Sequence, residues 1–373
     1  MRNIESNLDR LPLIHLIAGA RPNFMKIAPI IRELDKHPES IRYQLIHTGQ
    51  HYDSSMSDVF FDELEIPKPD FHLNIGSGSH AVQTAKIMMA YEPVCITEKP
   101  DIVLVVGDVN STVACSLVAK KLNIKVAHVE AGLRSCDLEM PEEINRIVTD
   151  SITDYFFVTE KSGIDNLIAE GKLEENIFFV GHVMIDNLFY QVEKLKTLDK
   201  NKLKISTKLK EQYPEYGVVT LHRPSNVDDK KILTEIIEAL SEISQTMPLI
   251  FPIHPRTKNS LENFNVKLPE TIIITEALPY MEFLNLFKDG KIVLTDSGGI
   301  QEETTALHVP CLTLRENTER PITVEKGTNI IVGTSRESII TKSVQALNTN
   351  TSRTLPELWD GKASQRIIKS IFN

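Results

Sequence analysis

Short runs of apolar residues recur along the first half of the chain, and a turn followed by a helical pattern separates each run from the next. Apolar runs without polar alternation are typical of parallel strands that are buried on both faces. Strands and helices that alternate in this way predict a doubly wound parallel α/β sheet. The strands expected in this half are 13–18, 43–47, 102–106, 124–129, 155–158 and 177–180.

A second series of strands and helices follows segment 186–212, which is rich in Lys and Leu and which we interpret as a connecting helix. Since 373 residues are enough for two separate cores, we expect two Rossmann-like domains that face each other across a cleft. The first covers 1–182 and the second 183–359, and a C-terminal helix at about 360–373 packs back on the first. The strands expected in the second domain are 217–221, 249–253, 272–274, 292–294 and 311–314.

Composition narrows the classes of function. The net charge of −10 argues against a nucleic-acid partner, so local Arg, Lys and backbone N–H groups would have to hold an anionic ligand. No run approaches the roughly 20 apolar residues of a spanning helix, so we expect no membrane insertion. The four cysteines are far apart and lack the spacing of a zinc site, which favours reduced thiols in a cytoplasmic protein and no bound metal.

Three carboxylates follow closely on predicted strand ends or helix starts. Asp108 comes just after strand 102–106, Glu130 directly ends strand 124–129, and Glu142 lies where a helix should begin. In open α/β sheets, ligands bind outside the carboxyl ends of the strands. The three acids therefore predict a site at this edge of the sheet.

Structural roles are the alternative for these acids. Asp108 could cap the following helix, and Glu142 could be an ordinary acid of a helix start. Arg134 and Arg146 are near enough in sequence to form ion pairs with them. Glu130 is harder to explain in this way, because an acid that ends a strand has no capping role.

The first strand runs into a glycine turn and a helix that carries Arg21 and Lys26 near its start. A helix N-terminus of this kind helps to hold phosphate, although the turn matches neither the dinucleotide nor the P-loop pattern. Lys26 could also be a plain surface lysine. Gln50 and His51 follow the second strand, again on the expected ligand side.

The strongest motif of the second domain is a glycine turn between a strand and a helix, formed by Ser297, Gly298 and Gly299. Free N–H groups and the positive end of the helix would suit a diphosphate. A Glu one to two turns into the helix could then accept hydrogen bonds from both ribose hydroxyls. The alternative is that the glycines form only a turn.

Taken together, these motifs resemble those of the non-hydrolysing UDP-N-acetylglucosamine 2-epimerases. The resemblance implies a glycosyltransferase-B-like fold, a homodimer, no nicotinamide or metal cofactor, and a role in supplying cell-surface polysaccharide precursors. The matching segments run in the order of the family and cover most of the chain. They are 19–22 with Lys26, 49–51, 107–108, 128–134, 141–146, 220–223, 296–303 and 318–321.

The chemistry of that family would give the acids distinct roles. A base removes the C2 proton as UDP leaves C1, and UDP then adds back to a 2-acetamidoglucal while C2 is protonated on the opposite face. Two faces require two proton-transfer groups. By position, Asp108, Glu130 and Glu142 correspond to the catalytic acids and His222 to a catalytic histidine near the departing phosphate. The sequence does not say which acid serves which face.

The resemblance also implies the residues that bind a UDP-amino sugar. By position these are Arg21, Lys26, Gln50, His51, Arg146, Ser297, Gly298, Gly299, Glu303 and Arg320. Glu303 would bind the ribose hydroxyls, and Glu302 is the second choice because the carry-over depends on helix phase. Two departures from the family leave questions open. Asp53 stands where a glutamine is common, so activation by a second UDP-GlcNAc is open. The short loop before Pro141 also resembles epimerases that act on a UDP-diacetamido-glucuronate.

Two alternatives to an epimerase and one closer variant remain. A UDP-sugar glycosyltransferase would share the fold but has no evident use for three acids. A non-catalytic UDP-sugar sensor would bind its ligand without turnover. A hydrolysing epimerase would release the free sugar as its direct product.

Overall fold

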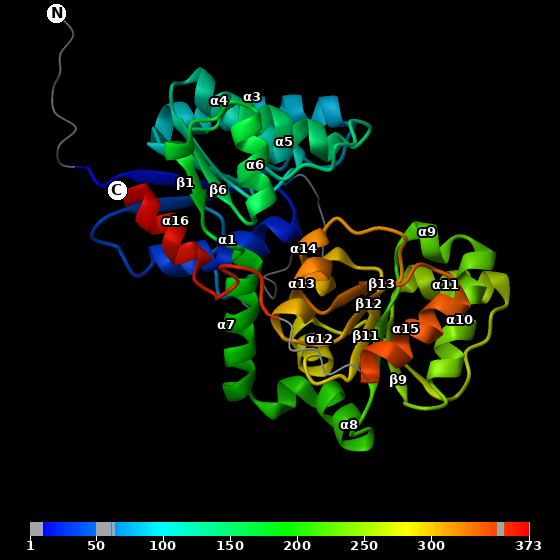
Figure 1. Ribbon diagram of the computed structural model, residues 1–373. Coiled ribbons are helices and arrows are strands. Elements are labelled where there is room, and N and C mark those ends of the chain that lie inside the picture. Colours follow the sequence, from blue (N-terminus) through cyan, green and yellow to red (C-terminus); the bar gives the residue numbers. More distant parts are fainter. Residues whose placement is uncertain (1–9, 50–60, 62–63, 349–353, 373) are drawn as a thin grey trace, which may run out of the picture. The chain divides into compact units, whose positions relative to one another are not determined.

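The structure is a computed structural model that describes residues 10–49, 61, 64–348 and 354–372 (Figure 1). The chain divides into two compact units. Unit 1 consists of Met1–Asn187 and Glu357–Asn373, and unit 2 of Leu188–Pro356. The expectation of two Rossmann-like units is confirmed, because each unit contains one parallel sheet with helices between its strands.

Unit 1 is built on a seven-stranded sheet in the order β3-β2-β1-β4-β5-β6-β7, and all its pairs are parallel. Six of these strands follow the Rossmann order, and β7 extends the edge. The β4 sequence Ile-Val-Leu-Val-Val is buried throughout, as a central parallel strand requires. The strands are β1 (Leu13–Ala18), β2 (Arg42–His47), β3 (Phe71–His72), β4 (Ile102–Val106), β5 (Lys125–Val129), β6 (Tyr155–Val158) and β7 (Ile177–Phe179).

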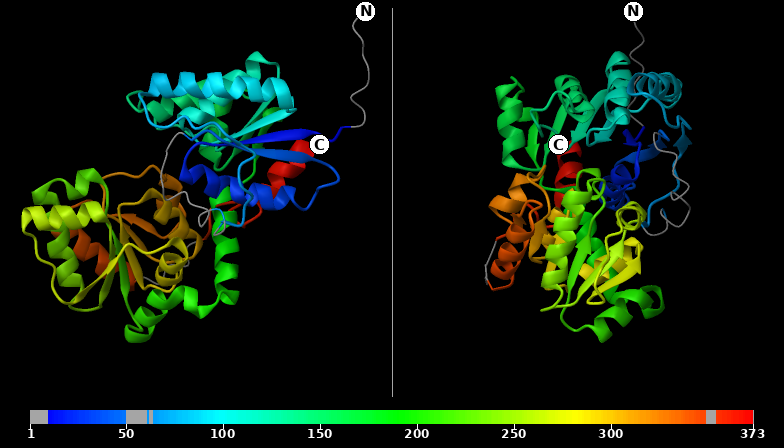
Figure 2. Two further views of the ribbon diagram at one scale, coloured as in Figure 1. Left: turned by 180° about the vertical axis from the view of Figure 1, so that it is seen from behind. Right: turned by 90° about the vertical axis from the view of Figure 1, so that its right-hand side faces the viewer.

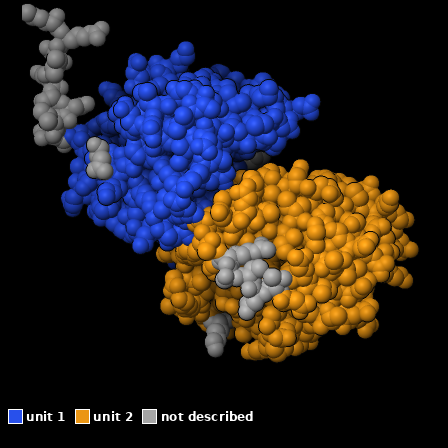
Figure 3. Space-filling view, viewed as in Figure 1, with its two compact units in different colours: residues 1–187, 357–373 blue, residues 188–356 orange. Residues whose placement is uncertain are grey.

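Helices cover both faces of this sheet (Figures 1 and 2). They are α1 (Arg21–Leu34), α3 (His80–Glu98), α4 (Asn110–Lys121), α5 (Pro141–Ile152), α6 (Lys161–Ala169), the 3₁₀-helix η1 (Glu174–Asn176) and α16 (Ala363–Phe372). Neighbouring residues of a strand point to opposite faces, so Leu16 packs beside α1 and α16, and Ile17 beside α3 and α4. Asp186 accepts hydrogen bonds from the backbone N–H groups of Ala363 and Ser364, which anchors α16 in unit 1. Figure 3 shows unit 1, which includes residues 357–373, and unit 2 in different colours.

Unit 2 repeats the Rossmann order in a six-stranded parallel sheet, β10-β9-β8-β11-β12-β13. Its strands are β8 (Gly217–Thr220), β9 (Leu249–Ile253), β10 (Ile272–Glu276), β11 (Ile292–Thr295), β12 (Cys311–Thr313) and β13 (Asn329–Ile331). Its helices are η2 (Lys200–Leu203), α8 (Lys204–Gln212), α9 (Pro224–Val227), α10 (Lys230–Ile243), α11 (Pro255–Phe264), α12 (Tyr280–Phe287), α13 (Gly298–Ala306), α14 (Pro321–Glu325) and α15 (Arg336–Asn348). Helices α10 and α15 pack together over one face of the sheet.

The predicted single helix over 186–212 is wrong. Helix α7 (Val183–Thr197) ends earlier, and the chain then turns into η2 and α8. The Asp199 carboxylate accepts the backbone N–H of Asn201, so this side chain caps a new helical start where a continuous helix was expected. Across the described part of the chain, no helix combines the length and the apolar character that crossing a bilayer requires.

Strand order places the predicted site segments at one edge of each sheet. In each unit the order reverses between two adjacent strands, β1 and β4 in unit 1 and β8 and β11 in unit 2. The carboxyl ends of such strands form the crevice that binds ligands in this class of sheet. Val106 pairs with Val129 across β4 and β5, so Gly107 and Glu130 leave the sheet side by side.

Candidate active site

A buried ion pair lies at the carboxyl edge of the unit 1 sheet. The Nζ atom of Lys26 is 2.5 Å from Oε2 of Glu130, and the two side chains are 13% and 6% exposed. Lys26 comes from α1, and Glu130 follows β5 in a left-handed conformation with φ of 74°. A non-glycine residue in this conformation is strained, and such strain is concentrated at functional sites. Lys26 therefore compensates the charge of a carboxylate that the backbone turns out of the strand.

Gly107 forms the turn after β4, beside this ion pair and directly before the predicted acid Asp108. Its φ is +65°, and a Cβ added there would lie 3.0 Å from Nζ of Lys26 and 3.6 Å from Oε2 of Glu130. The position thus needs glycine for its conformation and for its lack of a side chain. The tight turn after β4 lets the ion pair and Asp108 occupy the same edge.

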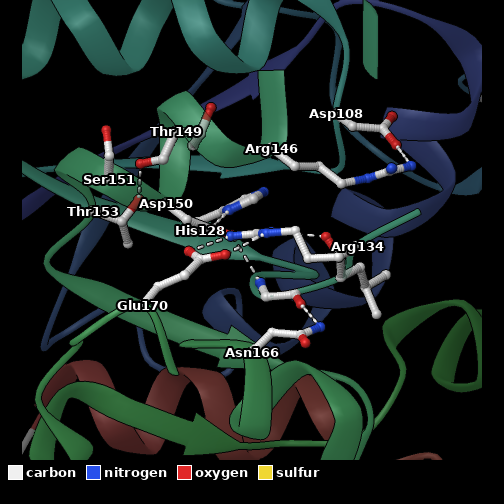
Figure 4. A network of polar contacts seen from close by, with 12 residues as sticks. Asp108, His128, Arg134, Arg146, Thr149, Asp150, Ser151, Thr153, Asn166 and Glu170 are labelled. Atoms are coloured by element: carbon white, nitrogen blue, oxygen red, sulfur yellow. Dashed lines mark hydrogen bonds and ion pairs between the residues drawn. The ribbon is translucent and has the colours of Figure 1, made fainter. Parts of the chain in front are cut away.

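Arg146 on α5 joins two acids. Its guanidinium is ion-paired with Asp108 (Figure 4). Its Nη1 atom is 2.8 Å from Oε2 of Glu143. Burial would raise the pKa of Glu143, but the backbone N–H groups of Ser135 and Cys136 and the Arg146 guanidinium outweigh it and lower that pKa. Glu143 therefore stays an anion that fixes both Arg146 and the loop before α5.

The other predicted residues of unit 1 are less enclosed. Glu142 lies in the first turn of α5 and is half-buried, and Arg21 is the exposed first residue of α1. Both stand at helix starts on the carboxyl side of the sheet. Gln50 and His51, predicted to bind substrate, lie outside the described residues.

In unit 2, Asp296 organises the ends of β8 and β11. This fully buried carboxylate lies 2.9 Å from Nδ1 of His222 and accepts the backbone N–H groups of His222 and Arg223. Burial would raise the pKa of Asp296, but these contacts outweigh it and hold the pKa below its usual value. Because Asp296 engages Nδ1, it orients the imidazole with Nε2 directed away from the carboxylate.

The glycine turn opens helix α13 directly after this pair. Ser297 is the N-cap, Gly298 is the first helical residue, and Gly299 is exposed. A Cβ at Gly298 would lie 3.7 Å from Oε2 of Glu319, whose Oε1 is 3.0 Å from Nη2 of Arg315. A carboxylate already lies close to this helix start, which is a favourable place for an anion.

The geometry separates the two candidate ribose acceptors. Glu302 is ion-paired with Arg320, with Oε1 2.5 Å from Nε. Glu303 accepts the Tyr280 hydroxyl at Oε1, and its buried Oε2 has no hydrogen-bond partner in the described part of the chain. Burial raises the pKa of Glu303 to about 7. An unpaired buried acceptor is costly, so Glu303 is the better placed of the two to receive ligand hydroxyls.

Comparison with known proteins decides the family. The family model described as UDP-N-acetylglucosamine 2-epimerase matches residues 32–372. The chain belongs to the UDP-N-acetylglucosamine 2-epimerase family. The predictions of the family and of its enzyme class, an isomerase, are thereby confirmed. A Methanocaldococcus jannaschii protein named UDP-N-acetylglucosamine 2-epimerase is 45% identical over 363 residues, which cover 95% of this chain and 98% of that protein.

Other members of the epimerase family are also similar. A UDP-2,3-diacetamido-2,3-dideoxy-D-glucuronate 2-epimerase of Pseudomonas aeruginosa is 39% identical over 360 residues, or 95% of this chain and 97% of that protein. The crystal structure of the M. jannaschii UDP-GlcNAc 2-epimerase in complex with UDP-GlcNAc and UDP matches with a TM-score of 0.82 at 44% identity. The match covers 96% of this chain and 99% of that structure, which confirms the glycosyltransferase-B-like fold.

Three residues of this candidate site had no role predicted from the sequence. Asp296 stood in the glycine motif, but its pairing with His222 joins positions that are distant in the sequence. Asp150 was missed, although it lies seven residues after Glu143 and thus on the same buried face of α5. Tyr280, which bonds Glu303, carried no signal of its own.

Proposed function

We propose that the chain catalyses the reversible C2 epimerisation of UDP-N-acetylglucosamine to UDP-N-acetylmannosamine. The observation that carries the proposal is that Asp108 and Glu130, each beside a compensating cation, follow the neighbouring strands β4 and β5 at the carboxyl edge of one sheet, next to its topological switch point. The similarity to a M. jannaschii enzyme that was solved with UDP-GlcNAc and UDP supports the choice of substrate.

The proposed reaction is an elimination followed by an addition. A carboxylate removes the C2 proton, the C1–O bond to UDP breaks, and a C1=C2 double bond forms in the 2-acetamidoglucal. UDP then adds back to C1 while an acid protonates C2 from the other face. The carboxylates available for these proton transfers are Asp108, Glu130 and Glu142, which belong to three segments of unit 1.

Unit 2 would hold the UDP group. The start of α13 at Ser297, Gly298 and Gly299 offers N–H groups to the diphosphate, and Glu303 accepts the ribose hydroxyls. His222, oriented by Asp296, would donate a proton or hydrogen bond to the phosphate as it departs. We also assign Arg21, Lys26, Arg146 and Arg320 to the binding surface, where their charges suit a diphosphate.

The test is the product formed from UDP-GlcNAc by the purified protein, followed by proton NMR. We expect UDP-ManNAc to accumulate to an equilibrium ratio that is also reached from UDP-ManNAc. Free ManNAc as the first product would instead establish a hydrolysing epimerase. UDP binding without any sugar turnover would support a sensor, and transfer to an added acceptor would support a glycosyltransferase.

A related substrate is a second candidate, because the P. aeruginosa relative is named as a UDP-2,3-diacetamido-2,3-dideoxy-D-glucuronate 2-epimerase. The same elimination would serve that sugar, which differs at C3 and C6. Rates for both substrates should be measured side by side. If the protein epimerises only the uronate, the uronate is the substrate in place of UDP-GlcNAc, and the proposed mechanism stays the same.

We also propose that the protein is a cytoplasmic homodimer that supplies precursors for cell-surface polysaccharides. Helix α3 supports the dimer, because Val82, Met89 and Ile96 are 47%, 75% and 56% exposed. Residues seven apart lie on one side of a helix, so these side chains form a stripe that a second copy would cover. Four free cysteines suit a reducing compartment. Subcellular fractionation tests the location.

A further inference from the structure

His128 is a fully buried residue of β5, two positions before Glu130. Its Nε2 atom is 2.8 Å from the carbonyl oxygen of Gly107, and its Nδ1 atom is 2.7 Å from Oδ1 of Asp150 (Figure 4). The ring therefore connects the turn after β4 to helix α5. Neither contact belongs to the proton transfers assigned above.

Both neighbours of the ring are acceptors. A carbonyl oxygen can only accept a hydrogen bond, so Nε2 must carry a proton. Asp150 also accepts the N–H of Gly132 at 3.0 Å and lies 2.8 Å from Nη1 of Arg134, as expected for an ionised carboxylate. Burial would raise the pKa of Asp150, but His128, Arg134 and the Gly132 N–H outweigh it and lower that pKa. With Nδ1 also donating, His128 is an imidazolium.

The charges around this imidazolium compensate one another. Arg134 is paired with Asp150 and, at 2.8 Å, with Glu170 on the more exposed side of the cluster. Two cations and two carboxylates thus form a chain from the sheet to α6 and the surface. A buried charge persists only when it is paired and hydrogen-bonded in this way.

The hydrogen bond to Gly107 acts on the peptide group that joins Gly107 to Asp108. The Gly107 N–H donates to the carbonyl oxygen of Val129 at 3.0 Å, and the Gly107 carbonyl oxygen accepts from His128. Residues of β5 therefore hold both backbone polar groups of Gly107. Fixing the peptide plane fixes the direction in which the next Cα–Cβ bond leaves the backbone. The Asp108 side chain then meets Arg146.

We propose that His128, kept charged by Asp150, is a positioning residue that fixes the Gly107–Asp108 turn and thereby places the Asp108 carboxylate for proton transfer. This inference rests on the proposed function. It gives the buried cluster a role in the chemical step that is separate from UDP binding, because His128 and Asp150 bond to Gly107, Gly132 and Arg134, none of which is assigned to UDP binding. Small displacements of a catalytic group are expensive, and about 1 Å can cost roughly 100-fold in rate.

The test compares His128→Gln with wild type in the steady-state rate of UDP-GlcNAc epimerisation. A glutamine amide has N–H groups on one atom only, so it cannot donate in two opposite directions. We expect kcat to fall by roughly 30- to 100-fold, while KM and the Kd of UDP change by less than about twofold.

His15→Gln is the matched control. His15 is also fully buried, lies on β1 of the same sheet, and has both ring nitrogens bonded, to Tyr91 and to Gln44. It should lose a similar amount of thermal stability and keep kcat within about threefold of wild type. A loss of kcat in His15→Gln equal to that in His128→Gln would reduce the role of His128 to general stability and overturn the inference.

Asp150→Asn tests the charge and remains informative if His128→Gln does not fold. A neutral partner no longer stabilises the imidazolium. The neutral ring can still donate from Nε2 to Gly107 while Nδ1 accepts from the amide, but it loses the charge that strengthens the bond to Gly107, so kcat should fall less than in His128→Gln, with little change in UDP affinity. An active wild type together with unchanged kcat in folded Asp150→Asn and His128→Gln would overturn this inference alone. A wild type without epimerisation would overturn the proposed function, and this inference with it.

Discussion

Gly107 shows how one missing side chain supports the proposed site. The residue has a left-handed backbone, and a Cβ added to it would lie 3.0 Å from Nζ of Lys26. Gly107→Ala should therefore displace the pair of Lys26 and Glu130 as well as strain the turn. We expect the epimerisation rate to fall by roughly 100-fold.

Gly171→Ala is the control for backbone strain. Its φ of +80° is just as unfavourable for alanine, but nothing lies within 4 Å of the added Cβ. The backbone strain should cost each variant about 1 kcal/mol in the free energy of unfolding, Gly107→Ala should lose further stability through the displaced ion pair, and only Gly107→Ala should lose activity. Equal activity in the two variants would contradict the described packing around Gly107.

Glu303 makes a prediction about pH. Its pKa is raised to about 7 in the folded protein from an ordinary 4.5, so the folded state holds this proton while the unfolded chain releases it. The protein should lose stability as pH rises from 4.5 through 7, by about 3 kcal/mol at most from this group.

Glu303→Gln has no proton to lose, so the loss of stability that Glu303 causes at rising pH should disappear. Urea unfolding of both proteins at pH 5 and pH 8 measures this pH dependence. Between pH 5 and pH 8, the variant should lose less stability than wild type. Identical pH dependence in the two proteins would show that Glu303 is not the buried acid described.

At the scale of elements, helix α3 makes the prediction about assembly. Met89 is the most exposed member of the stripe formed by Val82, Met89 and Ile96. Met89→Asp should bury a charge in the proposed interface and give monomers in sedimentation velocity experiments. Leu173→Asp is the control, because Leu173 is 62% exposed but lies outside α3 and should leave a dimer. A wild type that is monomeric at micromolar concentration would contradict the proposal.

Apolar runs predicted most strands of both sheets well. The strand expected at 102–106 is β4, and the one at 249–253 is β9, because a strand buried on both faces has no polar interruption. Helical boundaries were harder to predict. The Lys- and Leu-rich pattern of 186–212 continues across Asp199, so periodicity alone did not show that this side chain caps a new helical start.

At the scale of the molecule, the chain forms two sheets with the same strand order. In each sheet, a group of predicted site residues lies at the carboxyl ends of the strands near the switch point. Spacing after strand ends located Asp108, Glu130 and the glycine turn, because chain direction alone fixes the edge at which they emerge. The pairings of His222 with Asp296 and of His128 with Asp150 depend on tertiary packing, so the sequence could not predict them. The cleft between the domains stays a prediction.

The proposed function requires this molecule to break and remake the C2–H bond of a UDP-amino sugar. Incubation with UDP-GlcNAc in D2O, followed by proton NMR, tests it most directly, with Glu130→Gln as the variant. We expect deuterium at C2 together with UDP-ManNAc for wild type, and neither for Glu130→Gln that still binds UDP. UDP-ManNAc that keeps protium at C2, or unchanged exchange in the variant, would contradict it.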